Sequence, residues 1–222
     1  MRALDILDGP NDHVFYSCMF IAFDNMSPLF PQMSVVKVDK YDGVRYEEIE
    51  RDVVEKLEKS IIPSKTTSMP AVPNFLGEHK GPDGSMRVKG LQATTYGAFG
   101  ARAMLMLQNY DNPIPKFDGK AYTFTTTFHC GYLGIYATYP SAPTMPGGPL
   151  QYHQTLVNTY GLHGSIETFQ NGAAAYRNAK EWCKEQRDRM VLKANKIARA
   201  KKARSTNKSQ GTVDYARPLA TT

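Results

Sequence analysis

A short apolar stretch that begins and ends near prolines places the strongest constraint on how this chain folds. It runs from Val72 to Lys80, reads VPNFLGEHK, and is followed by the turn sequence GPDG and then by a helical pattern from Leu91. Residues two apart on a strand point to the same face, so Glu78 and Lys80 would share a face where the strand ends. A carboxylate that holds a divalent cation beside an ammonium group favours metal-dependent hydrolysis of a phosphodiester.

The hydrophobic pattern along the rest of the chain predicts alternating strands and helices. Ile49, Val53 and Leu57 repeat every four residues, which is typical of an amphipathic helix over 46–60. Alternation at period two indicates a hairpin formed by 121–129 and 132–139. The other expected elements are a strand over 34–39, a helix over 91–110 and a long helix from 165 onward. Residues 14–23 form a mostly apolar segment in which periodicity does not separate strand from helix.

Together these segments predict an α/β fold, with a small mixed central β-sheet flanked by helices and a long basic C-terminal helix. We expect residues 1–204 to form a single domain and residues 205–222 to form a polar, disordered tail. Tyr41, Asp42 and Gly43 have the chemistry of a turn. Gly97 and Gly100 each cost roughly 1 kcal/mol inside a helix relative to alanine, which is consistent with a helix that lies close to the sheet.

The composition excludes a membrane-spanning or disulfide-rich protein. The chain has 222 residues, of which 41% are hydrophobic, and no apolar run approaches the roughly 20 residues that cross a bilayer. Its start lacks the basic and apolar pattern of a signal peptide. The three cysteines are odd in number and far apart, as expected of reduced thiols. We therefore expect an intracellular protein, nuclear or cytoplasmic, without a membrane partner.

The net charge of +6 comes from one segment near the C-terminus. Between Arg189 and Lys208 there are eight basic residues and no acidic ones, so 19 basic residues face 21 acidic residues elsewhere. Such a segment attracts phosphates through counterion release, although it also fits a solvated helix end or a nuclear address. The candidate nucleic-acid contacts are Lys193, Lys196, Arg199, Lys201, Lys202 and Arg204.

Further polar residues stand at positions that could join Glu78 and Lys80. Asp39 ends the predicted strand over 34–39, and Asp42 is its rival as a metal ligand. Gln92 and Tyr96 are four residues apart on the helix after the turn, so they share a helix face. The pattern of Asp39, Glu78-His79-Lys80 and Gln92-x-x-x-Tyr96 resembles the PD-(D/E)xK nuclease superfamily, in particular its RecB-like and exonuclease-like branches.

More narrowly, residues 35–199 resemble a group of uncharacterised filamentous-fungal proteins. The matching pieces include KVDKYDG at 37–43, PNFLGEHKGPDGS at 73–85, GAFGAR at 97–102 and GAAAYRNA at 172–179. The superfamily resemblance implies a restriction-endonuclease-like core and a Mg²⁺-dependent (or Mn²⁺-dependent) phosphodiesterase, a nuclease that acts on nucleic acid, DNA in the first place. It leaves open whether Glu47, Glu48 or Glu50 replaces an acidic ligand that often comes from an N-terminal helix.

The same resemblance implies a role for each motif residue. Asp39, Glu78 and the backbone carbonyl of His79 would bind the metal ion, and Lys80 would position or activate the attacking water. Gln92 and Tyr96 would steady Lys80, the metal-bound waters or a substrate phosphate. The alternative is a nuclease-like fold without catalysis that binds nucleic acid or protein, and a protein partner or a homo-oligomer stays open. A structural or toxin–antidote component is a remoter alternative.

Overall fold

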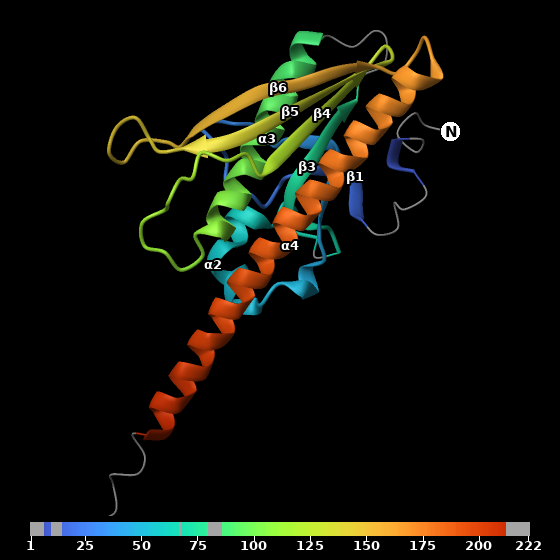
Figure 1. The fold of residues 1–222 in the computed structure, drawn as a ribbon. Helices are drawn as coiled ribbons and strands as arrows, with labels where there is room; N and C mark the ends of the chain where they lie inside the picture. Colours follow the sequence, from blue (N-terminus) through green and yellow to red (C-terminus); the bar gives the residue numbers. More distant parts are fainter. Residues whose placement is uncertain (1–6, 10–14, 67, 80–85, 212–222) are drawn as a thin grey trace, which may run out of the picture.

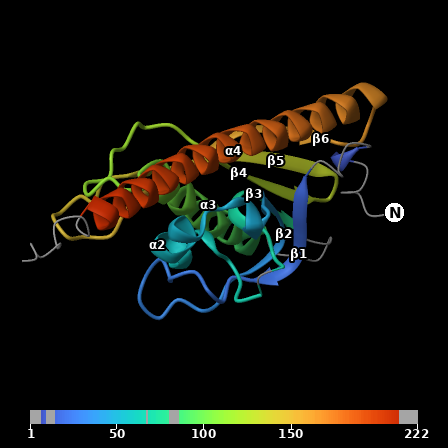
Figure 2. The same ribbon diagram turned by 90° about the horizontal axis from the view of Figure 1, so that it is seen from below.

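The centre of the molecule is a six-stranded mixed sheet with helices on both faces (Figures 1 and 2). The structure is a computed structural model and describes residues 7–9, 15–66, 68–79 and 86–211. Neighbouring strands are antiparallel throughout, except for the parallel pair β3 and β4. The strands lie across the sheet in chain order: β1 (Tyr16–Ala22), β2 (Lys37–Val44), β3 (Ala71–His79), β4 (Thr123–His129), β5 (Tyr132–Ser141) and β6 (Gln151–Gly161). The predicted α/β fold with a mixed central sheet is confirmed.

The helices form the two outer layers. They are the short 3₁₀ helix η2 (Tyr46–Glu48), α2 (Arg51–Ile61), α3 (Met86–Gln108) and α4 (Ile166–Gly211). Parallel neighbouring strands need a crossover, and α3 provides it between β3 and β4. In Figure 2, α4 lies on one side of the sheet and α2 and α3 lie on the other. The predicted long C-terminal helix is confirmed.

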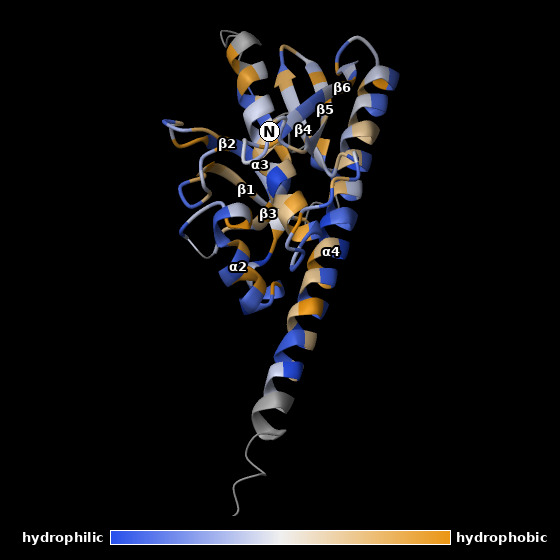
Figure 3. Ribbon diagram, turned by 90° about the vertical axis from the view of Figure 1, so that its left-hand side faces the viewer, coloured by the Kyte–Doolittle hydropathy of each residue, from blue (hydrophilic) through white to orange (hydrophobic). Residues whose placement is uncertain are grey.

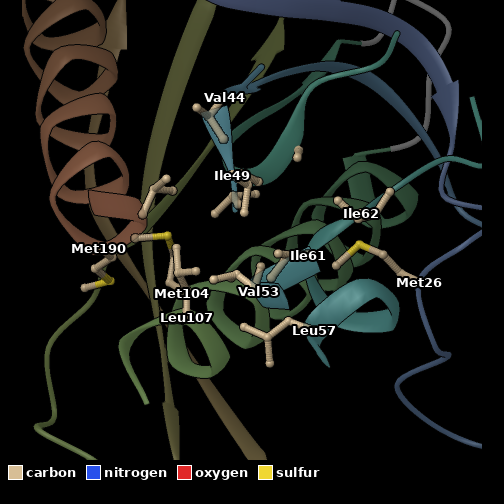
Figure 4. Close-up of a cluster of buried hydrophobic side chains, with 14 of the residues drawn as sticks. Met26, Val44, Ile49, Val53, Leu57, Ile61, Ile62, Met104, Leu107 and Met190 are labelled. Atoms are coloured by element: carbon tan, nitrogen blue, oxygen red, sulfur yellow. The ribbon is translucent and has the colours of Figure 1, made fainter. Parts of the chain in front are cut away.

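Two clusters of buried apolar side chains fill the space between these layers. The larger one joins α2, α3 and the facing side of the sheet to the middle of α4 (Figure 4). Val53 and Leu57 of α2 and Met104 of α3 belong to it, so the predicted apolar stripe of α2 is buried as expected. The smaller cluster lies under the first half of α4, where Phe75 of β3 meets Tyr176 edge-on at 5.2 Å.

The predicted turn at 41–43 is wrong, because β2 continues through it to Val44. Tyr41 is fully buried and packs edge-on against Phe23, with the ring centroids 5.3 Å apart. Asp42 is buried too, and its Oδ1 accepts a hydrogen bond of 2.6 Å from Ser17 of β1. Gly43 lets the carbonyl of Ala71 approach within 2.3 Å of where a Cβ would stand. These tertiary contacts outweigh the local turn preference of the three residues.

The predicted helix over 46–60 is divided in two. Ile49 and Glu50 have extended ψ angles of 128° and 138°, and they separate η2 from α2. Asn195 of α4 accepts a hydrogen bond of 2.8 Å from the Glu50 amide and donates one of 2.7 Å to the Glu48 carbonyl. This amide side chain satisfies backbone groups that a continuous helix would have paired internally.

The remaining expectations about the elements divide clearly. The helix after β3 and the hairpin of β4 and β5 are confirmed. The strand predicted to end at Lys80 is present as β3 up to His79, and Lys80 lies outside the described residues. The strand predicted over 34–39 instead spans Lys37–Val44. The apolar segment over 14–23 contains β1, and β6 was not predicted. The final helix extends to Gly211, beyond the predicted domain boundary at residue 204, and residues 212–222 lie outside the described part.

Two glycines of α3 let this helix approach the sheet, as their positions predict. A Cβ at Gly97 would stand 2.4 Å from Thr138 Oγ1. A Cβ at Gly100 would stand 2.6 Å from Thr123 Cγ2 and 3.0 Å from the carbonyl oxygen of Pro73. Gly90 on the same helix has no atom within 4 Å of its Cβ position.

We expect alanine at position 100 to lower the free energy of unfolding by about 1–3 kcal/mol, because it overpacks the contact between α3 and the sheet. Alanine at position 90 meets open space and should raise this free energy by up to about 1 kcal/mol through helix propensity alone. Urea unfolding of the two variants measures both changes. Equal effects of Gly100→Ala and Gly90→Ala would contradict the close approach.

Candidate metal site at the end of β3

The register of the sheet places the two predicted metal ligands beside each other. β2 and β3 pair with Lys40 opposite Gly77 and Tyr41 opposite Leu76. The next step of this register sets Asp39 opposite Glu78, and opposite residues share a face with their Cβ atoms about 4.5–5.5 Å apart. Asp39 Oδ2 accepts a hydrogen bond of 2.8 Å from the amide of His79, the residue after Glu78. Asp39, which was predicted to end a strand, therefore lies near the start of β2 and beside Glu78 near the end of β3.

Two carboxylates in this arrangement repel each other. Like charges directly opposite on an antiparallel pair are destabilising, and the side chain of Glu78 is fully buried. Tyr96 is hydrogen-bonded to Glu78 and the His79 amide to Asp39, and a divalent cation between the two carboxylates would offset the repulsion between them. Asp39 and Glu78 thus have the donor chemistry that Mg²⁺ or Mn²⁺ requires.

Tyr96 of α3 lies over the carboxylate pair. Its hydroxyl oxygen is 2.7 Å from Glu78 Oε2 and 2.8 Å from the carbonyl oxygen of Lys37. Burial, and then the hydrogen bond and negative charge of Glu78 and the charge of Asp39, raise the pKa of Tyr96 above its ordinary value. The hydroxyl therefore stays protonated and acts as a hydrogen-bond donor rather than as a base.

Gln92 stands one helical turn before Tyr96, as its spacing predicts. Its Nε2 lies 3.5 Å from the hydroxyl oxygen of Tyr96. Its Oε1 is buried and has no hydrogen-bond partner within the described ranges. A buried amide oxygen normally has a donor, so this atom is available to a ligand or to a water molecule at the site.

Two motif residues follow Glu78, and of these the structure describes His79 but not Lys80. A Cβ at Gly77 would lie 2.7 Å from Cε1 of His79, so the His79 ring lies over Gly77. Alternation along β3 puts this ring on the face opposite to Glu78, which leaves the backbone carbonyl as the group of His79 that can serve the site. Lys80 follows β3 directly and lies outside the described residues.

The alternative acidic ligands do not join the pair. Asp42 points to the other face of the sheet, where Ser17 and Lys180 contact it. Glu47, Glu48 and Glu50 follow the far end of β2; Val44 is five residues beyond Asp39, or about 16 Å at roughly 3.3 Å per residue. Glu50 also forms an ion pair of 2.6 Å with Arg199. The geometry therefore favours Asp39 over each of these alternatives.

A buried ionic network on the α4 face of the sheet was not predicted. Lys180 of α4 is 1% exposed, and its Nζ lies 2.7 Å from Asp8 Oδ1 and 3.7 Å from Asp42 Oδ2. Lys40 of β2 also pairs with Asp8. Burial alone would raise the pKa of Asp8, but hydrogen bonds from Lys180 and Lys40 hold it below its ordinary value. Burial raises the pKa of Asp42 despite the same lysines.

The predicted nucleic-acid contacts all lie on exposed positions of α4, whose second half extends past the sheet (Figures 1 and 3). Two of the six are neutralised by the body of the protein, because Arg199 pairs with Glu50 and Lys201 pairs with Asp111. The other four form no ion pair with any described residue: Lys193, Lys196, Lys202 and Arg204.

The chain matches no known protein family, no curated protein and no solved structure. Within the described ranges, no three or more His, Cys, Asp and Glu side chains gather as a metal-binding group. The candidate site offers two carboxylates, and residues 80–85 beside it are not described. No helix in the described part of the chain has both the length and the apolar character to cross a lipid bilayer.

Proposed function

We propose that this protein is a Mg²⁺-dependent phosphodiesterase that cleaves DNA. The observation that supports this most strongly is the pairing of Asp39 and Glu78 on neighbouring antiparallel strands, with the Tyr96 hydroxyl 2.7 Å from Glu78. Like charges directly opposite on neighbouring strands are destabilising, and one cation bound by both carboxylates would relieve this repulsion. The resemblance of the motif to the PD-(D/E)xK nucleases assigns that ligand as a hard divalent cation.

The donor set fits Mg²⁺ or Mn²⁺, since carboxylate and carbonyl oxygens are the ligands that these ions prefer. When bound, such an ion supplies a water of lowered pKa and neutralises charge that develops on the scissile phosphate. Asp39 and Glu78 would hold it with the carbonyl of His79. Tyr96 holds the carboxylate of Glu78 in place through a hydrogen bond to Oε2.

Lys80 would provide the cationic side chain of the proposed active site. It comes two residues after Glu78, so continued strand alternation would put its side chain on the carboxylate face. There an ammonium group would orient the attacking water and stabilise negative charge on the phosphorane. Gln92, whose Oε1 is free for a ligand, would hold a water molecule next to Tyr96.

Cleavage of DNA by the purified protein, with Mg²⁺ or with a chelator, tests the proposal. The wild type should cleave only with the divalent cation, and Lys80→Ala should lower the rate at least about a hundredfold, as expected for loss of a group that acts in the transition state. Lys120→Ala, an exposed lysine on a loop, is the matched control and should cleave like the wild type. Equal cleavage by Lys80→Ala and Lys120→Ala would remove Lys80 from the mechanism.

A second candidate function is binding of nucleic acid through α4 without catalysis. It rests on the four exposed cations of α4 that have no acidic partner among the described residues. Removing the chain from Ala194 onward would not test it, because Ala194 and Ala198 are buried in the larger core. Substitution of exposed lysines is the test that leaves the fold intact.

We expect replacement of Lys193, Lys196 and Lys202 by glutamine to weaken DNA binding and to reduce the slope of log K against log salt by about 3, or roughly 0.9 per phosphate contact. The matched control replaces three exposed lysines of the body by glutamine: Lys65, Lys116 and Lys120. Fluorescence anisotropy at several salt concentrations gives both slopes. A slope that falls equally in both triple variants would show that α4 has no special part in binding.

A further inference from the structure

A cavity of about 140 Å³ opens between the far end of β2 and α4, at the opposite end of β2 from Asp39. One buried water molecule needs roughly 10–15 Å³ in the same measure, so the cavity has room for a small polyatomic group. Residues at the start of β1, at the end of β2 and along α4 line it, and its charged members are Arg45, Glu48, Lys184, Arg187 and Asp188.

Arg187 lines this cavity and is only 1% exposed. Its Nη1 donates a hydrogen bond of 2.5 Å to Asn74 Oδ1, and Asn74 is itself fixed by the carbonyls of Tyr122 and Cys183 at 3.0 and 2.8 Å. The nearest carboxylate oxygen of Asp188 is 3.9 Å from Nε, and Nε has no hydrogen-bond partner among the described residues.

Burial of the charged guanidinium of Arg187 is energetically unfavourable. A buried cation is costly unless a hydrogen-bonded anion accompanies it. Burial lowers the pKa of Arg187, and the nearby charges of Asp42, Asp188 and Glu48 oppose this shift. Arg187 is held rigidly through Asn74 while its Nε edge stays without an acceptor. An oxyanion in the cavity would add a negative charge close to this guanidinium.

The mouth of the cavity carries two further cations. The guanidinium of Arg45 lies 4.8 Å from the centre of the Tyr16 ring, so an aromatic face rather than an acid positions it. Lys184 Nζ lies 2.6 Å from Asp188 Oδ2 and neutralises one of the two acids in the lining. With Glu48 as the other acid, the lining keeps an excess of one positive charge.

We propose that this cavity binds a small molecule through one oxyanion, a carboxylate or a phosphate group, held by the guanidinium groups of Arg187 and Arg45. Arginine suits this task because its planar fork matches both groups. A second cavity of about 290 Å³ shares Val44, Glu48 and Asp188 with the first and continues along α4. It has room for the rest of the ligand. This site is separate from the carboxylate pair and does not depend on the proposed hydrolysis.

Titration calorimetry of the full chain with inorganic phosphate, and separately with acetate, tests the site at constant ionic strength set with NaCl. At least one of the two anions should bind saturably, with one site per chain; phosphate alone identifies a tetrahedral group and acetate alone a planar one. Arg45→Gln should weaken binding about tenfold, as for one charge-assisted hydrogen bond. Arg187→Lys keeps the charge but removes the fork, and it should abolish saturation.

Arg51→Gln is the matched control, since Arg51 is an exposed arginine of α2 that pairs with Glu55, and it should bind like the wild type. If Arg187→Lys does not fold, the comparison of Arg45→Gln with Arg51→Gln decides alone. Binding that saturates for neither anion would overturn the proposal. So would equal affinities of Arg45→Gln and Arg51→Gln, because the anion would then lie elsewhere.

Discussion

Glutamine in place of Glu78 should reduce Mg²⁺-dependent DNA cleavage by about a thousandfold or more while leaving the fold intact. A metal ion contributes several kcal/mol to a hydrolytic transition state, and each 1.36 kcal/mol corresponds to a factor of ten in rate. Glutamine keeps an oxygen that can accept the hydrogen bond from the Tyr96 hydroxyl, which now lies 2.7 Å from Glu78 Oε2. It removes the charge that would hold the cation.

The stability of the same variant separates a functional carboxylate pair from a structural one. Glu78→Gln removes the repulsion with Asp39 and keeps an acceptor for the Tyr96 hydroxyl, so the free energy of unfolding without metal should stay within about 1 kcal/mol of the wild type. Asp39→Asn should show the same combination of lost activity and kept stability. The matched control is Glu47→Gln, an exposed acid near the other end of β2, which should cleave like the wild type. Loss of stability in step with activity would indicate a structural role for the pair.

Methionine in place of Lys180 should lower the free energy of unfolding by about 3–5 kcal/mol, the largest stability change that we expect in this chain. Lys180 is 1% exposed and lies 2.7 Å from Asp8 and 3.7 Å from Asp42. Methionine fills a similar volume but leaves buried carboxylates without this cation, and breaking a buried pair from one side has a cost of that size.

Lys184→Met is the matched control, one turn further along α4. Its pair with Asp188 is partly exposed, with side-chain exposures of 32% and 42%, and such pairs contribute about 0–1 kcal/mol. Chemical unfolding monitored by circular dichroism gives both values. If the two lysine variants lose equal stability, the network on the α4 face does not hold the sheet and α4 together.

Much of the architecture follows from local patterns in the sequence. The four-residue repeat of α2 corresponds to a face that is buried in the structure, and the two segments with period-two alternation are the paired strands β4 and β5. The two glycines of α3 predicted a close helix–sheet contact, and the structure contains it. β6 escaped prediction because its central residues are mostly exposed, so it lacks the apolar alternation that marks a half-buried strand.

The arrangement of the candidate site could be predicted from the sequence in part. Helical spacing was enough to predict that Gln92 adjoins Tyr96, because this pair rests on local geometry. The approach of Asp39 to Glu78 was implied only by the resemblance of the motif to a nuclease superfamily, because the two residues lie on different strands. The network of Lys40 and Lys180 was not accessible. Lysine is normally exposed, so sequence alone predicts a surface position for Lys40 and Lys180. Their burial depends on Asp8, which is far away in the chain. Asp42 was misassigned to a turn for the same reason.

Anomalous diffraction from crystals of the protein grown with Mn²⁺ tests the central claim most directly. We predict a manganese peak between the carboxylates of Asp39 and Glu78, within about 2.0–2.3 Å of an oxygen of each, and no peak there in crystals of Glu78→Gln. A wild-type structure in which manganese is absent from this pair, or in which the two carboxylates are held only by protein groups, would contradict it.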